Sequence, residues 1–278
     1  MQRKGGETDR RTRAASAAAP GRRKPPRRGL RLRRALLAGA LLYLTLAIGS
    51  LQLNWARLHE GLGRGARFAS GFLHPDFTTR GQDISEGIIE SLAITVVATV
   101  AGIALSIPLG FGAARNMVPS AVYLTCRAAV TVSRSFHEVI VAIFFVVMVG
   151  FGPLAGALTL AFSSIGFLGK LLAEEIEALD AGQIEAVRAT GASWPQVVAY
   201  GVLPQMMPRL VGLSAYRLDI NFRESAVIGV VGAGGIGATL NTAFGRYEFG
   251  TAAAILILIV LIVLGGELAS GRLRRRLL

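Results

Sequence analysis

The sequence predicts an all-α integral membrane protein with about six transmembrane helices. Hydrophobic residues make up 52% of the 278 residues and charged residues only 17%, whereas soluble domains carry about 25% charged residues. The apolar residues are gathered into long runs, as expected for a bilayer core that needs about 20 apolar residues per helix. Lysine and arginine are distributed unevenly between the segments that connect these runs.

The apolar runs define the expected helices in chain order. Residues 35–53 contain no charged residue, and residues 88–114 contain only Glu90. Residues 139–169 are uncharged, and Gly152-Pro153 breaks this run into two expected helices joined by a tight hairpin. Two further spans are expected at residues 210–231, which are less apolar, and 249–266.

The distribution of basic residues predicts the orientation in the membrane. Residues 1–34 hold thirteen lysines and arginines but no aromatic residue that could stack on bases, so nucleic-acid binding is not favoured. This stretch is also longer than the basic region of a secretory signal, and its composition favours a disordered tail. The expected inner segments carry twenty-one basic residues and the expected outer segments five. Both termini are therefore predicted to be cytoplasmic.

The expected organisation has four parts. They are a disordered basic cytoplasmic tail (1–34), a first transmembrane helix (35–53), an extracytoplasmic loop (54–83) and a transmembrane domain (84–276). Cys126 is the single cysteine, which excludes a disulfide or a cysteine metal cluster within one chain. We expect no metal site.

The transmembrane domain contains one long polar loop, residues 174–208, which has to fold in water. Asp180 is suited to cap a helix, and Gly191 is suited to the left-handed position that ends it. Ser193 restarts a helix, with Gln196 three residues later completing a capping box. The loop is therefore predicted to contain two short helices with a sharp turn between them.

Leu203-Pro204 and Pro208 are expected to end the second of these helices. A helix–glycine–helix unit is also typical of DNA-binding helix-turn-helix motifs. This unit, however, lies between two expected membrane spans and contains Arg188 as its one basic residue. A docking surface for a cytoplasmic partner is the favoured interpretation.

The spacing of this loop resembles the signature of importer-type ABC permeases: Glu-Ala-Ala, three residues, Gly, nine residues, then Ile-x-Leu-Pro. Here Glu185-Ala186-Val187 is followed by Gly191 and by Gly201-Val202-Leu203-Pro204. Val187 replaces an alanine and Gly201 replaces an isoleucine, and both substitutes are apolar or small. The resemblance implies a coupling helix that inserts into a groove of a cytoplasmic ATPase subunit. The residues implied in coupling are Glu185, Ala186, Gly191, Ala192, Leu203 and Pro204.

Other stretches resemble the phosphonate permease subfamily, and the resemblance covers residues 84–276. They are IPLGFGAARN (107–116), SRSFHEVIVAIFFVVMVGFGPLAG (133–156), IEAVRATGAS (184–193) and NFRESAVIGVVGAGGIG (221–237). Phe136-His137 departs from it, because an apolar residue followed by proline is expected there. The resemblance implies a type I ABC importer core like that of methionine importers.

For function, the resemblance implies a permease subunit in a bacterial plasma membrane. It would carry phosphonate or a related phosphorus oxyanion from an extracytoplasmic binding protein to the cytoplasm by alternating access. The sequence contains no P-loop, so ATP and Mg are expected to be used by a partner ATPase dimer, and the chain itself is expected to be neither an enzyme nor a cofactor carrier. Two ATPases imply a second permease copy, with a homodimer expected. Phosphite, or an amino acid such as methionine, is the alternative substrate.

Residues 210–231 hold four charged side chains that are costly in a membrane and by default face a bundle interior or an aqueous cavity. Asp219 and Arg223 are four residues apart in the order that favours a helical ion pair, and Arg217 and Glu224 share a face. They either tie helices together or line an anion path. His137 is interpreted as a packing residue. The candidate path residues are Arg134, Ser135, Arg217, Asn221, Arg223 and Glu224.

The stretch VVGAGGIG satisfies the dinucleotide-binding pattern G-x-G-x-x-G, which raises a membrane-anchored oxidoreductase as a rival. That fold needs a second strand within about thirty residues, whereas a short polar stretch and an apolar run follow here. A passive channel, the other rival, would not need the coupling loop. Helix packing or gating is the favoured role for the tract. Its residues are Gly232, Gly234, Gly235 and Gly237.

Overall fold

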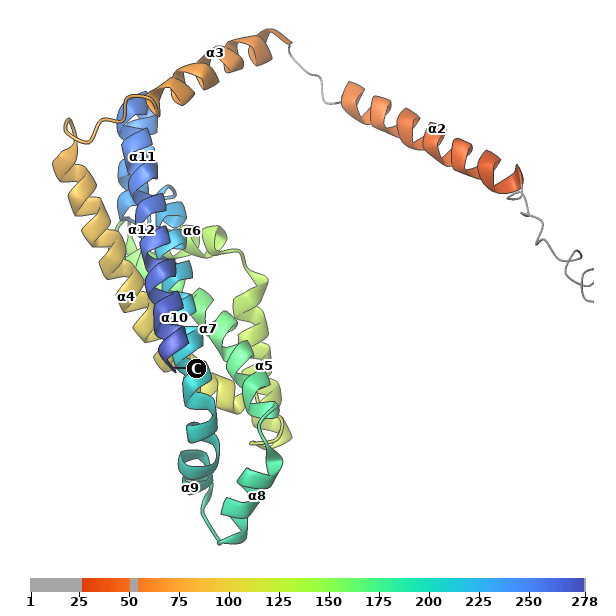
Figure 1. The fold of residues 1–278 in the computed structure, drawn as a ribbon, viewed down its shortest axis with the longest axis vertical. Helices are drawn as coiled ribbons and strands as arrows, with labels where there is room; N and C mark the ends of the chain where they lie inside the picture. Colours follow the sequence, from red (N-terminus) through yellow and green to blue (C-terminus); the bar gives the residue numbers. More distant parts are fainter. Residues whose placement is uncertain (1–26, 51–54, 278) are drawn as a thin grey trace, which may run out of the picture. The chain divides into compact units, whose positions relative to one another are not determined.

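The computed structural model describes residues 27–50 and 55–277, and these residues form helices and turns without a strand (Figure 1). By its internal contacts the chain divides into one unit of residues 1–63 and a second of residues 64–278. The helix α2 (Arg27–Ser50) belongs to the first unit, and α3 (Trp55–Gly71) crosses the boundary. All later helices belong to the second unit.

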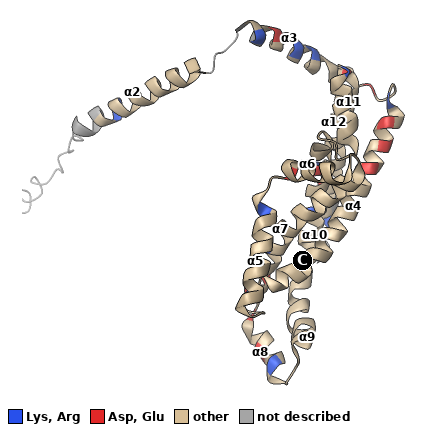
Figure 2. Ribbon diagram, turned by 180° about the vertical axis from the view of Figure 1, so that it is seen from behind, with Lys and Arg blue, Asp and Glu red and all other residues tan. Residues whose placement is uncertain are grey.

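The helix α2 begins at Arg27, before the span predicted from Ala35. Residues 27–34 therefore belong to a helix and not to the predicted tail, because leucine and arginine are good helix formers. Residues 1–26 lie outside the described residues. The apolar stretch Leu32–Ser50 has the length and composition of a membrane span, with its charged residues confined to one end (Figure 2). None of its side chains is buried within the described part of the chain.

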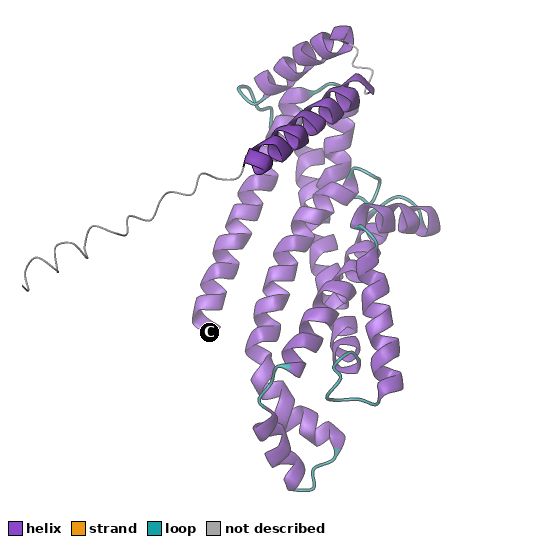
Figure 3. Ribbon diagram, turned by 90° about the vertical axis from the view of Figure 1, so that its right-hand side faces the viewer, coloured by secondary structure: helices purple, strands orange, loops and turns teal. Residues whose placement is uncertain are grey.

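Long helices lie side by side in the second unit (Figures 1 and 3). The most extensive contact joins α4 and α7, and α10 packs against α4, α7 and α12. Small residues permit this close approach: a Cβ at Gly110 would lie 2.8 Å from Leu172 Cβ, and one at Gly102 would overlap Ser164. The long helices are α4 (Gly81–Gly112), α7 (Pro153–Glu177), α10 (Leu203–Gly229) and α12 (Phe249–Leu277).

The predicted hairpin at Gly152-Pro153 is present between α6 (Glu138–Val149) and α7. Gly150 and Gly152 have φ values of 93° and 129°, which favour glycine. With 12 residues, α6 is only about 18 Å long and cannot cross a bilayer alone. The preceding α5 (Ser120–Ser135) meets it at an angle of 94°, so the structure has a bent pair of helices where one straight span was predicted from residue 139. The bend falls at Phe136-His137.

The described residues contain four helices that are long and apolar enough to cross a membrane, or five if the bent pair is one span. The charged residues of α10 exclude it from that number on composition, although it is 27 residues long and packs among the spans. With the bent pair counted as one span and α10 included, the number agrees with the six spans predicted. An all-α membrane fold is confirmed.

The segment that precedes α4 is more ordered than a simple loop. It contains α3 and a turn in which Asp76 Oδ1 accepts hydrogen bonds from Thr78 N, Thr78 Oγ1 and Thr79 N at 2.9–3.0 Å. These bonds hold the pKa of the Asp76 carboxyl well below its usual range. A short helix that was not predicted, α11 (Ile236–Gly245), follows the glycine tract.

Candidate functional site

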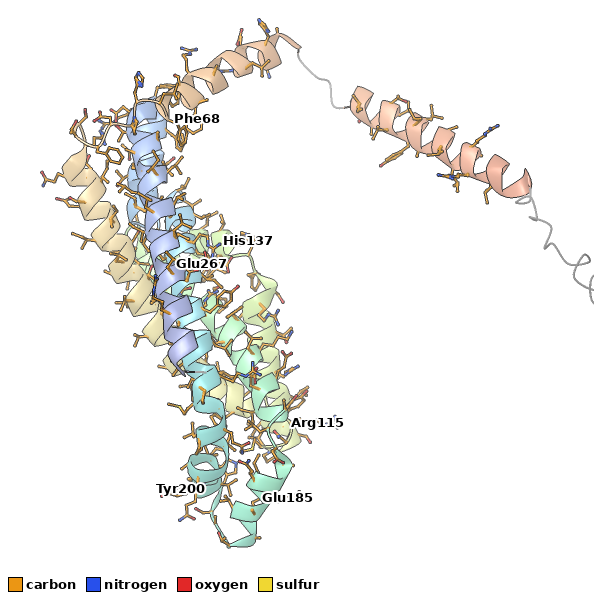
Figure 4. All side chains as sticks on the ribbon, in the orientation of Figure 1. Phe68, Arg115, His137, Glu185, Tyr200 and Glu267 are labelled. Atoms are coloured by element: carbon orange, nitrogen blue, oxygen red, sulfur yellow. The ribbon has the colours of Figure 1, made fainter. Side chains whose placement is uncertain are left out.

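The polar loop forms one end of the second unit, where α8 (Ala181–Ala189) and α9 (Trp194–Gln196) project beyond the long helices (Figures 1 and 4). Asp180 Oδ1 accepts a hydrogen bond from Gly182 N at 2.9 Å and so caps α8 as predicted. Gly191 has a φ of +77° and makes the turn. The Gln196 side chain accepts from Ser193 N at 2.8 Å, which completes the predicted capping box.

The second helix of the loop does not end at Leu203-Pro204 or Pro208, and that prediction is wrong. The chain passes from α9 through a π-helical segment, Val197–Val202, directly into α10. Pro204 lies where the π-helical segment meets α10, and it removes one backbone donor without interrupting the helical path. Pro208 removes one backbone hydrogen bond without ending the helix.

An open groove of about 650 Å³ lies along the loop, between the side chains of α8 and those that follow the turn. Glu185 and Tyr200, both exposed, project from the two arms (Figure 4). Of the residues implied in coupling, Pro204 is also exposed, and Leu203 is partly buried against the core. The groove is lined by Ala186, Val187, Thr190, Gly191, Ala192, Gln196 and Tyr200.

The loop is attached to the helix bundle by its apolar face. Ile184 and Val197 are buried in the cluster formed by the ends of α4, α7 and α10. Trp194 Nε1 donates a hydrogen bond to Met117 O at 3.1 Å, and Arg209 forms an ion pair with Glu175 at 3.4 Å. A partner that binds the exposed face therefore acts on a surface that is packed directly on the spans.

A second cluster surrounds Arg217 within the bundle. The guanidinium is buried, with Nε donating to Ser164 Oγ at 2.8 Å and Nη2 to Ser163 Oγ at 3.0 Å. Nη2 also lies 3.3 Å from Glu224 Oε2, so the predicted pairing across seven residues is present. Its Cζ lies 5.4 Å from the centre of the Phe167 ring, a cation–π distance.

Glu138 joins this network from another helix, and the sequence reasoning did not single it out. Ser163 Oγ donates to Glu138 Oε1 at 2.7 Å, so one serine hydroxyl connects the carboxylate of α6 to Arg217 of α10. The sequence feature that could have identified Glu138 is its place as an acidic residue at the beginning of an otherwise apolar run. A carboxylate in that position needs a polar partner on a neighbouring helix.

Asn221 lies one turn along α10 from Arg217 and is fully buried. Its Nδ2 donates to Thr99 Oγ1 at 2.8 Å and to Ser164 Oγ at 3.3 Å, which connects α10 to α4 and α7. Its Oδ1 is buried without a hydrogen-bond partner among the described residues. Asn221 and Arg217 therefore share Ser164, and they fix the register of three helices.

The other candidate path residues lie apart from this cluster. Arg223 forms the predicted pair with Asp219 at 3.3 Å, but its side chain is 58% exposed, so Arg217 and not Arg223 is the buried arginine of α10. Arg134 and Ser135 are exposed at the end of α5. His137 is also exposed, and its Nδ1 accepts a hydrogen bond from Val139 N at 3.4 Å. It caps α6 and is not the packing residue expected.

The glycine tract forms a tight turn between α10 and α11 with helix on both sides, which is not the strand–turn–helix of a dinucleotide site. Gly232, Gly234 and Gly235 have φ values of 99°, 78° and 71°. A Cβ at Gly237 would overlap the carbonyl oxygen of Ala226, and one at Gly234 would lie 2.8 Å from Glu90 Oε1. The tract brings α10, α11 and α4 into backbone contact.

A multi-pass bundle that carries an exposed helix–glycine–helix loop is the architecture of a transporter permease subunit. Residues 106–278 match the family described as "Binding-protein-dependent transport system inner membrane component", and the chain belongs to this family. It is an importer-type ABC permease, and the resemblance to phosphonate permeases is confirmed.

Named relatives agree with this assignment. The chain is 47% identical over 204 residues to the phosphate-import permease protein PhnE of Mycolicibacterium smegmatis, covering 73% of this chain but only 38% of that protein. It is 37% identical to the phosphite transport system permease protein PtxC of Stutzerimonas stutzeri, covering 87% of each. An inward-facing structure of the MetNI methionine ABC transporter has a TM-score of 0.62 and 27% identity, covering 72% of this chain and 100% of that one.

Proposed function

We propose that the chain is the membrane subunit of an ATP-driven importer for phosphonate or a related phosphorus oxyanion. Substrate would pass from an extracytoplasmic binding protein to the cytoplasm by alternating access. The observation that carries this proposal is the exposed α8–Gly191–α9 loop, which is packed on the spans yet presents an open groove. ATP and Mg would be bound by a partner ATPase dimer, and the chain itself would supply no catalytic residue and no cofactor site.

The loop would dock on the ATPase, inside the cell. Glu185 and Ala186 on α8, Gly191 and Ala192 at the turn, and Leu203-Pro204 at the beginning of α10 would form the coupling surface. Both termini would then lie in the cytoplasm of a bacterial cell, as the charge distribution predicts. Because an ATPase dimer offers two grooves, a second copy of this chain would complete the transporter.

The path for the substrate would run along α5 and α10. Arg217 and Asn221 set the helix register. Glu224 pairs with Arg217 but keeps 24% of its side chain exposed, and Arg223 has 58% of its side chain exposed. Arg134 and Ser135 would contribute from α5. Cations would attract the oxyanion, and the neighbouring carboxylates would prevent tight trapping.

The glycine tract would serve helix packing and gating. Its residues allow α10, α11 and α4 to touch, so a change in the angle between these helices would open or close the adjacent end of the path. Gly232, Gly234, Gly235 and Gly237 are the residues assigned to this role.

Uptake by proteoliposomes tests the function directly. The chain would be reconstituted with its ATPase and binding protein, and radiolabelled methylphosphonate, phosphite, phosphate and methionine would be offered in turn. We expect ATP-dependent uptake of at least one phosphorus oxyanion, since named relatives are phosphate and phosphite permeases. Uptake of methionine alone, or uptake that does not need ATP, would contradict the proposal.

Glu185→Lys tests the coupling loop and should abolish stimulated ATP hydrolysis and uptake. Gln183→Lys is the matched control, because it adds a positive charge to α8 about 200° around the helix from Glu185. We expect the control to retain both activities. An equal loss of ATP hydrolysis and uptake in the two variants would show that any added positive charge on α8 disrupts coupling, and that the position of Glu185 has no special role.

A further inference from the structure

One face of α5 is cationic. Arg127, Thr131, Arg134 and Ser135 are spaced at i, i+4, i+7 and i+8, which places them on the same side of the helix. Arg127 and Arg134 are the only charged residues of α5. If α5 starts at one membrane surface, Arg134 would lie about 20 Å along it, at a depth where an unpaired cation is costly.

The neighbouring helix α7 adds a third cation. Gly166 permits a very close approach of the two helices, since a Cβ there would lie 2.6 Å from Arg134 Cγ and 2.8 Å from Ser133 Oγ. One turn further along α7, Lys170 reaches the same face of α5. It forms an ion pair with Glu174 at 3.3 Å.

These side chains line a half-open pocket of about 240 Å³, smaller than the 300–1,000 Å³ typical of drug-sized ligands. No residue of the described chain forms an ion pair with Arg127 or Arg134, and Nη1 of Arg127 is buried there without a hydrogen-bond partner. The pocket shares no lining residue with the Arg217 network. It is lined by Arg127, Val130, Thr131, Arg134, Ser135 and Lys170.

The contrast with Arg217 shows what is missing from the pocket. Arg217 is satisfied by two serine hydroxyls and a carboxylate, as a cation that only joins helices should be. Among the described residues Arg127 and Arg134 have no such partners, and Lys170 is the one of the three cations that pairs with a carboxylate, that of Glu174. The excess charge and the free N–H groups of two guanidinium forks match an anion with several oxygens.

We propose that this pocket binds a phosphorus oxyanion, with Arg127 and Arg134 donating to its oxygens and Lys170 balancing its charge. Phosphate and phosphonate groups offer three oxygens in the geometry that guanidinium groups recognise. The group would belong either to the transported solute or to a phospholipid headgroup. The choice of a phosphonate as the solute rests on the proposed function.

Binding is measured without transport, on the full chain purified with its ATPase in phosphatidylcholine nanodiscs. Saturation-transfer NMR of the methyl protons of methylphosphonate gives the signal. We expect Arg127→Gln/Arg134→Gln to lower it about ten-fold or more, because two charge-assisted contacts are lost. Arg115→Gln, which removes an exposed cation outside the pocket (Figure 4), should leave it unchanged. Arg127→Lys/Arg134→Lys keeps the charge and should retain part of the signal in a folded protein.

A second arm identifies the source of the oxyanion. Nanodiscs that contain phosphatidic acid would suppress the methylphosphonate signal if a headgroup occupies the pocket, and wild type would then retain more phosphatidic acid through purification than the double glutamine variant. A methylphosphonate signal that persists in nanodiscs with phosphatidic acid would assign the pocket to the solute. The proposal is overturned if the two arginines affect neither measurement, that is, if neither the methylphosphonate signal nor the retention of phosphatidic acid depends on Arg127 and Arg134. Absence of uptake in proteoliposomes with binding intact would instead overturn the proposed function alone.

Discussion

Val187 and Gly201, the two positions at which the coupling loop departs from the permease signature, face each other. A Cβ on Gly201 would lie 3.7 Å from Val187 Cγ2 and 3.6 Å from Ile184 Cα. Gly201 is buried within the π-helical segment. The larger residue on α8 is thus accommodated by the smaller one opposite it, so the two substitutions compensate in volume.

Gly201→Ile alone should therefore disrupt the loop. Its branched side chain would enter the space that Val187 fills, and overpacking of this kind typically costs about 1–3 kcal/mol. Val187→Ala/Gly201→Ile, which restores the signature, should recover most of the loss. Thermal denaturation and co-purification of the ATPase measure both effects, and additive losses in the double variant would show that the two residues are not coupled.

Arg217→Met should strongly destabilise the bundle. It leaves the carboxylates of Glu224 and Glu138 without their cation, and breaking a buried pair in this way typically costs about 3–5 kcal/mol. Arg217→Met/Glu224→Gln should be more stable than Arg217→Met, since it removes one uncompensated charge. Denaturation in detergent compares the variants, and equal stability of the two would show that Glu224 is not the partner that matters.

Arg223→Ala should behave differently from Arg217→Met. In its ion pair with Asp219 the arginine side chain is 58% exposed and the aspartate side chain 13% exposed, and pairs with an exposed partner typically contribute no more than about 1 kcal/mol. We expect normal assembly with the ATPase but little or no substrate uptake. Reconstituted uptake and co-purification measure the two properties separately, and loss of assembly would support a purely structural role.

Gly237→Ala should prevent the close crossing of α10 and α11. The added methyl group would overlap Ala226 O and approach Gly229 Cα to 2.9 Å, and we expect a loss of about 1–3 kcal/mol in stability. Gly245→Ala is the control from the same helix, because a Cβ there meets nothing within 4 Å. Similar melting temperatures for the two variants would contradict a packing role for Gly237.

Asp76→Asn should destabilise the turn before α4 in a pH-dependent manner. The folded protein lowers the pKa of this carboxyl, so its contribution is complete above the unfolded pKa of about 4 and is lost as the pH falls toward the folded value. The difference in melting temperature between wild type and Asp76→Asn should be constant near neutral pH and shrink below pH 4. A difference that does not change with pH would show that the ionised form has no special role.

Much of the fold could be predicted because membrane spans are long and apolar. The two short helices of the polar loop could be predicted because their capping residues lie close in sequence to the groups that they bind. Asp180, Gly191 and Ser193 act through contacts within a few residues, and all three behave as predicted. The prediction that Pro204 and Pro208 end a helix was wrong because each removes one backbone donor without interrupting the helical path.

The interior of the site could not be predicted from the sequence alone. Which arginine of α10 is buried depends on Ser163 and Ser164 of α7, and the sequence spacing of Arg217 and Arg223 does not reveal it. Glu138 gains its role only where α6 folds back on α7. The bend at Phe136-His137 likewise depends on how α5 and α6 pack against α7.

The uninterrupted helical path from Trp194 to Gly229 has a mechanical consequence. Beyond the loop, the 27 residues of α10 extend about 40 Å, so a rigid helix would carry a tilt of the loop to its far end. For a rigid helix of this length, a tilt of about 10° would displace the far end by about 7 Å. That end is the glycine turn, where three glycines with positive φ allow the backbone to change direction. A helix break at residues 203–208 would have removed this rigid connection between the loop and the glycine turn.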